Sequence, residues 1–407
     1  MEIIAGGVTA AKGFTAAGTA AGIKYQDRKD MAMIYSETPC RAAGVFTRNV
    51  VKAAPVLWDK EIVGRKGQVR AVVINAGIAN ACTGQQGYEA CSRTAGAAAK
   101  ALGIGETEVL VCSTGVIGMQ LPMDRIAEGA GKLAGLVRGG AEAGLEAAEA
   151  IMTTDTRPKQ AAVQVQIGGK TVTVGGMCKG SGMIHPDMCT MLAFVTTDAD
   201  ISADLLQEAL SCDVVDTFNM VSVDGDTSTN DTLLVLANGC AGNAPILEKN
   251  ADYDAFAAAL HEICVTLAKK IAGDGEGATA LFEAKVVGAD TKEHARVLAK
   301  SVITSSLTKA AIFGHDANWG RILCALGYAG VSFDPEKIEL YLESGAGRIL
   351  IYRDGNAADY SEKEASEILS CPEVTAYVDM KMGSEEATAW GCDLTYDYVK
   401  INADYRS

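Results

Sequence analysis

The chain has 407 residues, of which 48% are hydrophobic and 21% are charged, and its formal net charge is −15. This composition is that of a globular protein long enough to bury a large core, which argues against collagen-like, disordered and membrane-spanning classes. The acidic balance has the wrong sign for coating a phosphate backbone or an anionic membrane surface, so we expect no nucleic-acid and no membrane partner.

The twelve cysteines are scattered, and no two of them stand at the C-x-x-C spacing of a zinc site or a redox motif. The first residues show no signal peptide, and no uncharged apolar run reaches the 18 residues of a membrane span. We therefore expect a soluble, reduced, cytoplasmic protein.

In the first 151 residues, short β-type runs alternate with helical ones. Residues 70–75 and 108–112 have apolar, largely β-branched centres, which are typical of buried strands. Helical patterns occupy 88–101 and 123–151. The alternation predicts a layered α/β or α+β chain.

Residues 163–174 read VQVQIGGKTVTV, which is two alternating runs joined by Gly168 and Gly169. Glycine adopts positive φ at little cost, as two-residue hairpin turns require. The segment therefore predicts a β-hairpin.

The second half of the chain continues the mixture of helices and strands. Leu260, Cys264 and Leu267 stand at i, i+4 and i+7 and should share one buried helical face. The elements predicted here are helices at 203–210, 252–272 and 291–302, and strands at 338–342, 349–352 and 394–401.

The familiar catalytic and nucleotide motifs are missing. None of the four histidines stands in H-E-x-x-H, and the sequence contains no G-x-S-x-G elbow, no P-loop and no G-x-G-x-x-G after a strand. Residues 224–231 resemble a calcium loop, but the sixth position is Thr229 instead of Gly and the twelfth is Val235 instead of Glu. We interpret them as a polar turn before a strand at 232–237.

One kind of catalyst needs no histidine: a threonine whose own α-amino group is free. That amine has an ordinary pKa of about 7.7–8.0, close enough to neutrality to accept the hydroxyl proton. A glycine-rich, Pro-bent segment leads into an apolar run that Thr190 opens. Spacing alone favours the plainer interpretation, a loop entering a core strand.

The segment 179–192, KGSGMIHPDMCTML, resembles the processing site of the ornithine acetyltransferases, also called glutamate N-acetyltransferases or arginine-biosynthesis bifunctional proteins. The resemblance extends over essentially the whole chain. Its other motifs are GFTAAG, AAGVFTRNVVKAAPV, INAGIANACTG, CSTGVIG, IMTTDT, VDGDTSTND, GDGEGAT, AIFGHDANWGRI and AWGCDLTYDYVKINADY.

The resemblance implies self-cleavage between Cys189 and Thr190 into an α chain, 1–189, and a β chain, 190–407, which together form one interlocked catalytic unit. It also implies the layered α/β sandwich of this family and a heterotetramer of two α and two β chains. Family members usually carry Ala where this chain has Cys189. Both residues are small, and a buried, inert thiol is the expected state of the cysteine.

The implied reaction is ping-pong acetyl transfer, with neither a metal nor a bound cofactor. Thr190 attacks the acetyl carbonyl of N2-acetylornithine, Thr114 and Gly115 form the oxyanion hole, and glutamate then takes the acetyl group. The resemblance assigns the substrate contacts to Thr153, Lys179, Thr190, Glu276, Asn402 and Ser407. Some members also accept acetyl-CoA as a co-substrate, and we favour this bifunctional form.

Two alternatives remain open. A related N-terminal-nucleophile aminopeptidase or amidase would share the self-cleavage and the amine base, but would pass its acyl group to water. A non-catalytic, ligand-binding α/β protein would keep an uncut chain. Acetyl transfer to glutamate excludes the first alternative, and two fragments on a denaturing gel exclude the second.

Overall fold

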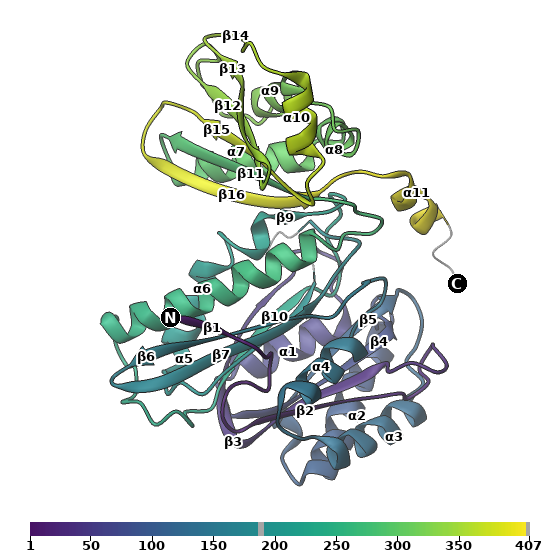
Figure 1. Cartoon of the computed structure of the whole chain (residues 1–407). Helices are drawn as coiled ribbons and strands as arrows, with labels where there is room; N and C mark the ends of the chain where they lie inside the picture. Colours follow the sequence, from purple (N-terminus) through teal and green to yellow (C-terminus); the bar gives the residue numbers. More distant parts are fainter. Residues whose placement is uncertain (186–190, 404–407) are drawn as a thin grey trace. The chain divides into compact units, whose positions relative to one another are not determined.

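The computed structural model describes residues 1–185 and 191–403 and divides the chain into two compact units. Unit 1 comprises residues 1–180, 186–218 and 227–267, and unit 2 comprises 181–185, 219–226 and 268–407. Each unit is a β-sheet with covering helices (Figure 1). The predicted mixed α/β class is confirmed.

Unit 1 holds most of the strands. Its strands are β1 (Glu2–Ile4), β2 (Phe14–Thr19), β3 (Met31–Phe46), β4 (Val69–Ile78), β5 (Val109–Val116), β6 (Lys159–Ile167), β7 (Lys170–Lys179), β8 (Leu192–Thr197) and β10 (Thr232–Ala237). Its helices are α1 (Ala54–Gly64), α2 (Gly84–Leu102), α3 (Met123–Leu136), α4 (Ala141–Ala150) and α5 (Ala203–Asp213), with a 3-10 turn at Glu106–Glu108. Helix α6 (Ala251–Ala272) begins in unit 1 and ends in unit 2.

These nine strands form one sheet in the order β1-β6-β7-β8-β10-β3-β4-β5, with β2 paired to β3. The long strand β3 joins the two halves of the sheet. Its first part, residues 31–35, pairs with β2 and β4, and its last part, 41–46, pairs with β10. Helices α2 and α3 pack on each other (Figure 1). Helix α2 also contacts β4 and β5, and α3 contacts β2 and β3.

The centre of this sheet is the parallel pair β8 and β10, in which every residue is buried. The strand predicted at 232–237 is confirmed, and so is the polar turn before it. Strands β1–β7 precede residue 190 and β8 and β10 follow it, so one sheet draws on both predicted chains. The division into 1–189 and 190–407 stays a prediction.

Unit 2 has a seven-stranded sheet in the order β14-β13-β12-β15-β11-β16-β9. Its strands are β9 (Val221–Ser222), β11 (Leu281–Ala289), β12 (Glu339–Ser344), β13 (Gly347–Arg353), β14 (Asn356–Ala357), β15 (Glu373–Asp379) and β16 (Glu385–Cys392). Its helices are α7 (Lys292–Thr304), α8 (Ser306–Phe313), α9 (Trp319–Gly327), α10 (Glu362–Leu369) and α11 (Tyr396–Ala403), with a 3-10 turn at Phe218–Met220 at its boundary with unit 1.

Two detailed predictions are confirmed. The hairpin forms as β6 and β7, and its turn residues Gly168 and Gly169 both have positive φ, 54° and 73°. In α6, the predicted face of Leu260, Cys264 and Leu267 is fully buried. Both elements have a strong local pattern that needs no distant partner to be recognised.

The single helix predicted at 123–151 is wrong, because the structure has two helices, α3 and α4, with a break at 137–140. In the break, Arg138 exchanges backbone hydrogen bonds with Ala16 of β2. Gly140 follows directly before α4 at φ +97°, a conformation that the interior of a right-handed helix does not contain. The sequence is rich in alanine on both sides of residues 137–140, so its composition did not indicate that the helix is interrupted.

The strand predicted at 394–401 is also wrong, because the structure has helix α11 there, pairing with no strand. The Thr395 hydroxyl accepts the N–H of Tyr398 at 3.4 Å, as a helix-capping side chain does. Asp397 in the first turn and Lys400 in the last suit the helix dipole and lie 2.8 Å apart. The alternating tyrosines and valine suggested a strand, but α11 buries none of its residues.

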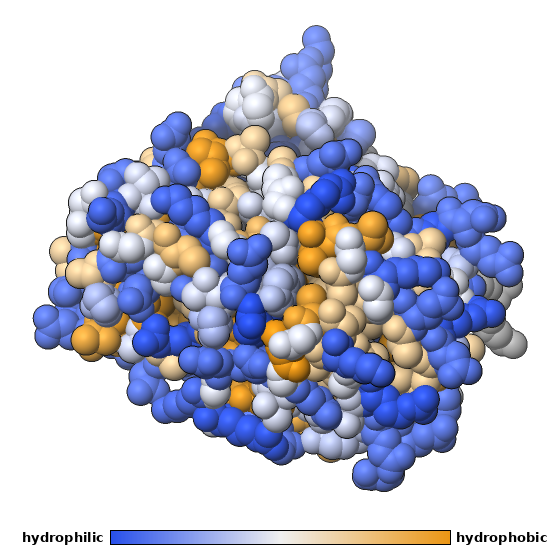
Figure 2. All heavy atoms as spheres, turned by 90° about the horizontal axis from the view of Figure 1, so that it is seen from below, coloured by the Kyte–Doolittle hydropathy of each residue, from blue (hydrophilic) through white to orange (hydrophobic). Residues whose placement is uncertain are grey.

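Hydrophobic side chains on the face drawn in Figure 2 form several small groups among mostly hydrophilic ones. Among the helices that the structure describes, none combines the length and the apolarity needed to cross a bilayer.

Candidate active site

Thr114 and Gly115 lie near the end of β5, where this strand runs parallel to β4. Gly77 stands opposite Gly115, and the ladder then bulges, so that Ile78 pairs with both Thr114 and Val116. Gly115 has φ +130°, and a Cβ there would lie 2.6 Å from the Ile78 nitrogen. Only glycine fits, and a bulge takes backbone groups out of the ladder, which is what an oxyanion site needs.

Buried polar side chains hold this strand end in place. The Asn230 amide donates to the carbonyls of Ala79 and Ser113, at 2.6 and 2.8 Å. The Ser113 hydroxyl donates to Asn75 Oδ1 at 2.6 Å, and the Asn75 amide donates to the Ile78 carbonyl at 2.9 Å. The ends of β4 and β5 are therefore cross-linked to the segment that leads into β10.

Asp155 organises two further predicted site residues, Thr153 and Lys179. Its Oδ2 accepts the Thr153 N–H at 3.1 Å and lies 4.0 Å from Lys179 Nζ. Its Oδ1 accepts from Lys159 Nζ and from the Gly180 N–H, both at 2.7 Å. All three charged side chains are buried. Two lysines share one carboxylate, so the three together keep one positive charge.

The protonation of Asp155 is set by these neighbours. Burial alone would raise the pKa of its carboxyl, but the charges of Lys179 and Lys159 and the hydrogen bonds from Lys159 and the Gly180 N–H act in the opposite direction. Together they hold the pKa of Asp155 well below its usual range. The carboxylate is therefore ionised throughout the physiological range.

Asp155→Asn is expected to lower the free energy of unfolding by about 3–5 kcal/mol, because it leaves two buried ammonium groups without their counter-ion. Urea titrations at pH 7 measure this loss. The folded pKa of Asp155 is below its unfolded value of about 3.9, so its stabilisation is present above that value and is lost as the pH falls through the folded pKa. The difference from wild type should therefore be constant between pH 7 and about pH 5 and shrink below about pH 4.

The matched control is Glu128→Gln, which removes an exposed carboxylate 2.8 Å from Lys132 in α3. Solvent screens an exposed pair of this kind, so its loss should change the stability little. Equal losses in the two variants would contradict the role given to Asp155.

In unit 2, Glu276 and Asn402 are in direct contact. The Asn402 amide donates to Glu276 Oε2 at 2.7 Å, and the Glu276 N–H donates to the Ser181 carbonyl at 2.9 Å. A Cβ at Gly182 would lie 2.5 Å from Glu276 Oε1, so this glycine lets the carboxylate lie directly on the backbone. Glu276 is buried, only 6% exposed.

A second carboxylate, Asp224, lies in the same unit and accepts the N–H groups of Met183 and Ile184, at 2.7 and 2.9 Å. Burial raises the pKa of Tyr398, and the negative charges of Asp224 and Glu276 raise it further. The surroundings of Glu276 are therefore electronegative and suit a cationic group.

Sequence reasoning assigned no role to Asp155 or Asp224, although both stand inside the quoted motifs IMTTDT and VDGDTSTND. A single aspartate in a sequence is most often a solvated surface charge. Their position in the sequence could have indicated a role, because each of the two aspartates lies within a few residues of threonines or glycines that were already singled out.

The predicted site residues fall into two groups. Thr114, Gly115, Thr153 and Lys179 lie in unit 1, and Glu276 and Asn402 lie in unit 2. Cys189, Thr190 and Ser407 lie outside the described residues. Their assignments stay predictions.

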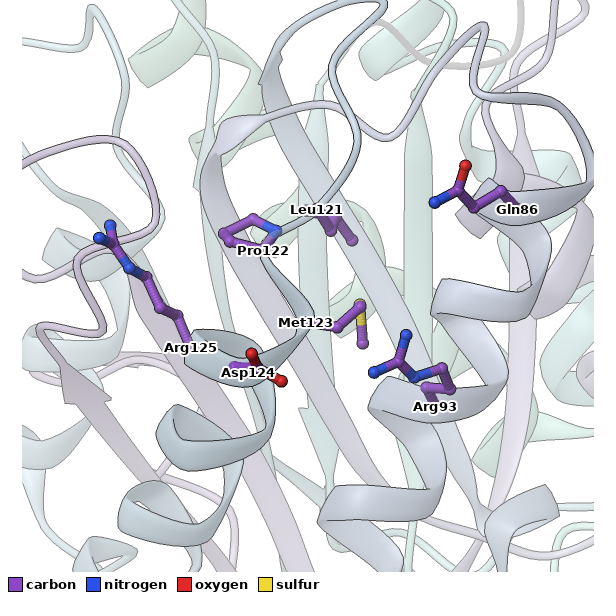
Figure 3. Close-up of a pocket in the computed structure, with 7 residues that line it drawn as sticks. All are labelled: Gln86, Arg93, Leu121, Pro122, Met123, Asp124 and Arg125. Carbon is purple, nitrogen blue, oxygen red and sulfur yellow. The ribbon is translucent and has the colours of Figure 1, made fainter.

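In the described parts of both units, no group of three His, Cys, Asp or Glu side chains is arranged to hold a metal ion. A pocket of about 420 Å³ lies between α2 and the start of α3. Figure 3 shows its lining, in which Arg125 points away from Gln86 and Arg93. The pocket contains none of the predicted site residues.

The ArgJ family model matches residues 15–407 of the chain. The chain is similar to the arginine biosynthesis bifunctional protein ArgJ of Symbiobacterium thermophilum, with 54% identity over 411 residues and full coverage of both chains. It is 50% identical to the protein of that name from Thermotoga neapolitana, covering 97% of this chain and 99% of the relative. The crystal structure of arginine biosynthesis bifunctional protein ArgJ from Bacillus halodurans matches with a TM-score of 0.50 and 46% identity, over 52% of this chain and 97% of that chain.

Proposed function

Because this chain belongs to the ArgJ family, we propose that it moves the acetyl group of N2-acetylornithine to glutamate in arginine biosynthesis. The products are ornithine and N-acetylglutamate. The enzyme is a glutamate N-acetyltransferase, and it works in the cytoplasm.

Thr190 is the proposed nucleophile, exposed at a new N-terminus by cleavage after Cys189. Its α-amino group takes the hydroxyl proton as Oγ attacks the acetyl carbonyl, and it returns that proton to the leaving amine of ornithine. Glutamate then attacks the acetyl-threonine ester, which regenerates the hydroxyl. The Thr114–Gly115 segment stabilises the oxyanion in both half-reactions.

Lys179 binds a substrate carboxylate, because the cluster around Asp155 keeps one positive charge in a buried setting. The Thr153 N–H donates to the Asp155 carboxylate, and the Thr153 side chain supplies a neighbouring polar group. Glu276, held by Asn402, receives the side-chain ammonium of ornithine. Ser407 is proposed as a further substrate contact because it stands where some relatives have Thr, which preserves the hydroxyl.

The observation that most supports this function is the glycine-only bulge at Gly115, braced by Asn230. A backbone segment held rigidly out of its ladder suits the stabilisation of an oxyanion in acyl transfer. It has no evident purpose in a passive binding protein.

An assay with N2-acetylornithine carrying a labelled acetyl group tests the reaction. With glutamate present, the label should appear in N-acetylglutamate, and initial rates should give the parallel lines of a ping-pong mechanism. Without glutamate, ornithine should be released only up to one equivalent per nucleophile. Labelled acetate accumulating at the same rate with or without glutamate would instead establish a hydrolase.

We also propose that acetyl-CoA serves as a second acetyl donor and that no bound cofactor takes part. Acetyl-CoA with glutamate should then yield N-acetylglutamate in the absence of acetylornithine. The proposed assembly, two α and two β chains, has twice the mass of one uncut chain, which light scattering measures directly.

A further inference from the structure

Thr114 and Gly115 lie where the pairing of the sheet is weakest. Strand β5 is the last strand in the sheet of unit 1, so a ladder holds it on one side only. That ladder, formed with β4, bulges beside Gly115. Peptides in a bulge are released from regular strand pairing and need other partners to keep a fixed direction. Groups outside the ladder must therefore hold this dipeptide.

The side-chain amide of Asn230 holds the dipeptide at its start. Asn230 Nδ2 donates to the Ser113 carbonyl at 2.8 Å. This carbonyl and the Thr114 N–H belong to one planar trans peptide and point in opposite directions. A hydrogen bond that fixes the carbonyl therefore also fixes the direction of the Thr114 N–H.

The same amide holds the dipeptide at its end, through Ala79. Asn230 Nδ2 donates to the Ala79 carbonyl at 2.6 Å, and the Ala79 N–H donates to the Val116 carbonyl at 2.9 Å. Val116 directly follows Gly115. The residues on both sides of the dipeptide are thus tied to a single side-chain nitrogen, one directly and the other through Ala79.

The orientation of the Asn230 amide is itself determined by a neighbour. The Thr229 hydroxyl donates to Asn230 Oδ1 at 2.7 Å, and the Thr229 carbonyl accepts the Ala53 N–H at 2.9 Å. The amide oxygen therefore faces Thr229, and both hydrogens of the nitrogen are used on the two backbone carbonyls. Asn230 is only 7% exposed, so water competes little for these bonds.

We propose that Asn230 is a positioning residue for acetyl transfer, whose one amide group sets the directions of the Thr114 and Gly115 groups that meet the oxyanion. The assignment rests on the proposed function, because it takes these two residues as the oxyanion hole. Asn230 acts through Ser113 and Ala79 and not by contact with the substrate.

A small displacement of the oxyanion donors should be costly. A misplacement of about 1 Å can lower a rate by about 100-fold. The negative charge develops only in the transition state, so the loss should be in kcat and not in KM. A residue needed only for folding would lower the stability and leave the kcat of the folded protein unchanged.

Asn230→Asp tests the proposal in the full-length, cut enzyme. Aspartate keeps the shape of asparagine but replaces the donating nitrogen by an oxygen, which repels the carbonyls of Ser113 and Ala79. Measured per cut chain, kcat should fall by about 100-fold, whereas KM for N2-acetylornithine should change by less than about threefold.

The matched control is Asn238→Asp, at the other end of β10. Asn238 is also 7% exposed, and its amide also donates twice, to the Lys12 carbonyl at 2.9 Å and to Ser36 Oγ at 3.2 Å. This variant should lower the urea midpoint as Asn230→Asp does, but it should keep the wild-type kcat. Equal losses of kcat in the two variants, or a wild-type kcat in folded Asn230→Asp enzyme, would overturn the assignment.

Amide hydrogen exchange tests the same inference without requiring a cut chain. In soluble Asn230→Asp protein, cut or uncut, peptides that cover residues 113–118 should exchange at least about tenfold faster than in the wild type or in Asn238→Asp. Unchanged exchange in this segment would contradict the proposal, because other groups would then hold the dipeptide.

Asn230→Ala covers the case in which the aspartate variant does not fold. It removes both N–H donors without adding a charge, so kcat should fall by about tenfold, whereas Asn238→Ala should keep its kcat. A folded Asn230→Ala enzyme with the wild-type kcat would refute the positioning role. Failure of the proposed function has a different signature, because the wild-type enzyme itself would then transfer no acetyl group to glutamate.

Discussion

Thr190→Ala is expected to leave a single uncut chain of 42.3 kDa and to lower the rate of acetyl transfer by a factor of about 10⁴ or more. Alanine lacks the oxygen that attacks both the upstream peptide bond and the acetyl group. Without the cut, residue 190 also has no free amine to act as base. The wild-type chain should give fragments of 189 and 407 − 189 = 218 residues. Intact-mass measurement and the labelled-acetyl assay read the two effects separately.

Thr190→Ser is the control, because serine keeps the hydroxyl and loses only a methyl group. It should still be cut and should keep a measurable part of the activity. A wild-type rate of acetyl transfer in the uncut alanine variant would rule out the threonine as nucleophile. So would wild-type protein that is fully active but unprocessed.

Gly115→Ala is expected to lower kcat by about 10²–10³-fold with a smaller change in KM. The new methyl group would overlap the Gly77 carbonyl and approach the Ile78 nitrogen to 2.6 Å. Strands β4 and β5 must then separate at the bulge, which displaces the donors that an oxyanion would use. Since the oxyanion exists only in the transition state and intermediates, the loss should be in kcat. Steady-state kinetics on cut, folded protein measures it.

Gly118→Ala separates this overlap from simple backbone strain. Gly118 also has positive φ, +85°, but a Cβ there meets nothing within 4 Å. This variant should lose about 1 kcal/mol of stability and keep its kcat. If Gly118→Ala and Gly115→Ala lose activity equally, the close approach of the new methyl group to Gly77 is not the cause of the loss of kcat.

Local patterns predicted a substantial part of this fold. The Gly168-Gly169 hairpin, the strand at 232–237 and the buried face of α6 are each encoded by neighbouring residues, and each is confirmed. The break before α4 depends on a backbone pairing with Ala16, more than a hundred residues away, and no local pattern reports it. Helix α11 has the composition of a strand but no strand to pair with.

The candidate site was predictable in a similarly uneven way. Thr114, Gly115, Lys179 and Glu276 entered through a resemblance, because their chemistry alone is that of ordinary turn or surface residues. Asp155 has its role from burial against Lys159 and against Lys179 and the Gly180 N–H, which lie more than twenty residues further along the chain. Burial of a carboxylate follows from tertiary packing, and a sequence does not display it residue by residue.

The placement of β8 between β7 and β10 has a consequence for handling the enzyme. A break just upstream of β8 would leave the two fragments paired twice within one sheet, by β7 with β8 on one side of the β8–β10 pair and by β3 with β10 on the other. Neither piece would keep a complete core after separation, so mild salt or dilution should not part them. The nicked protein should instead melt in one cooperative transition, with both fragments released together.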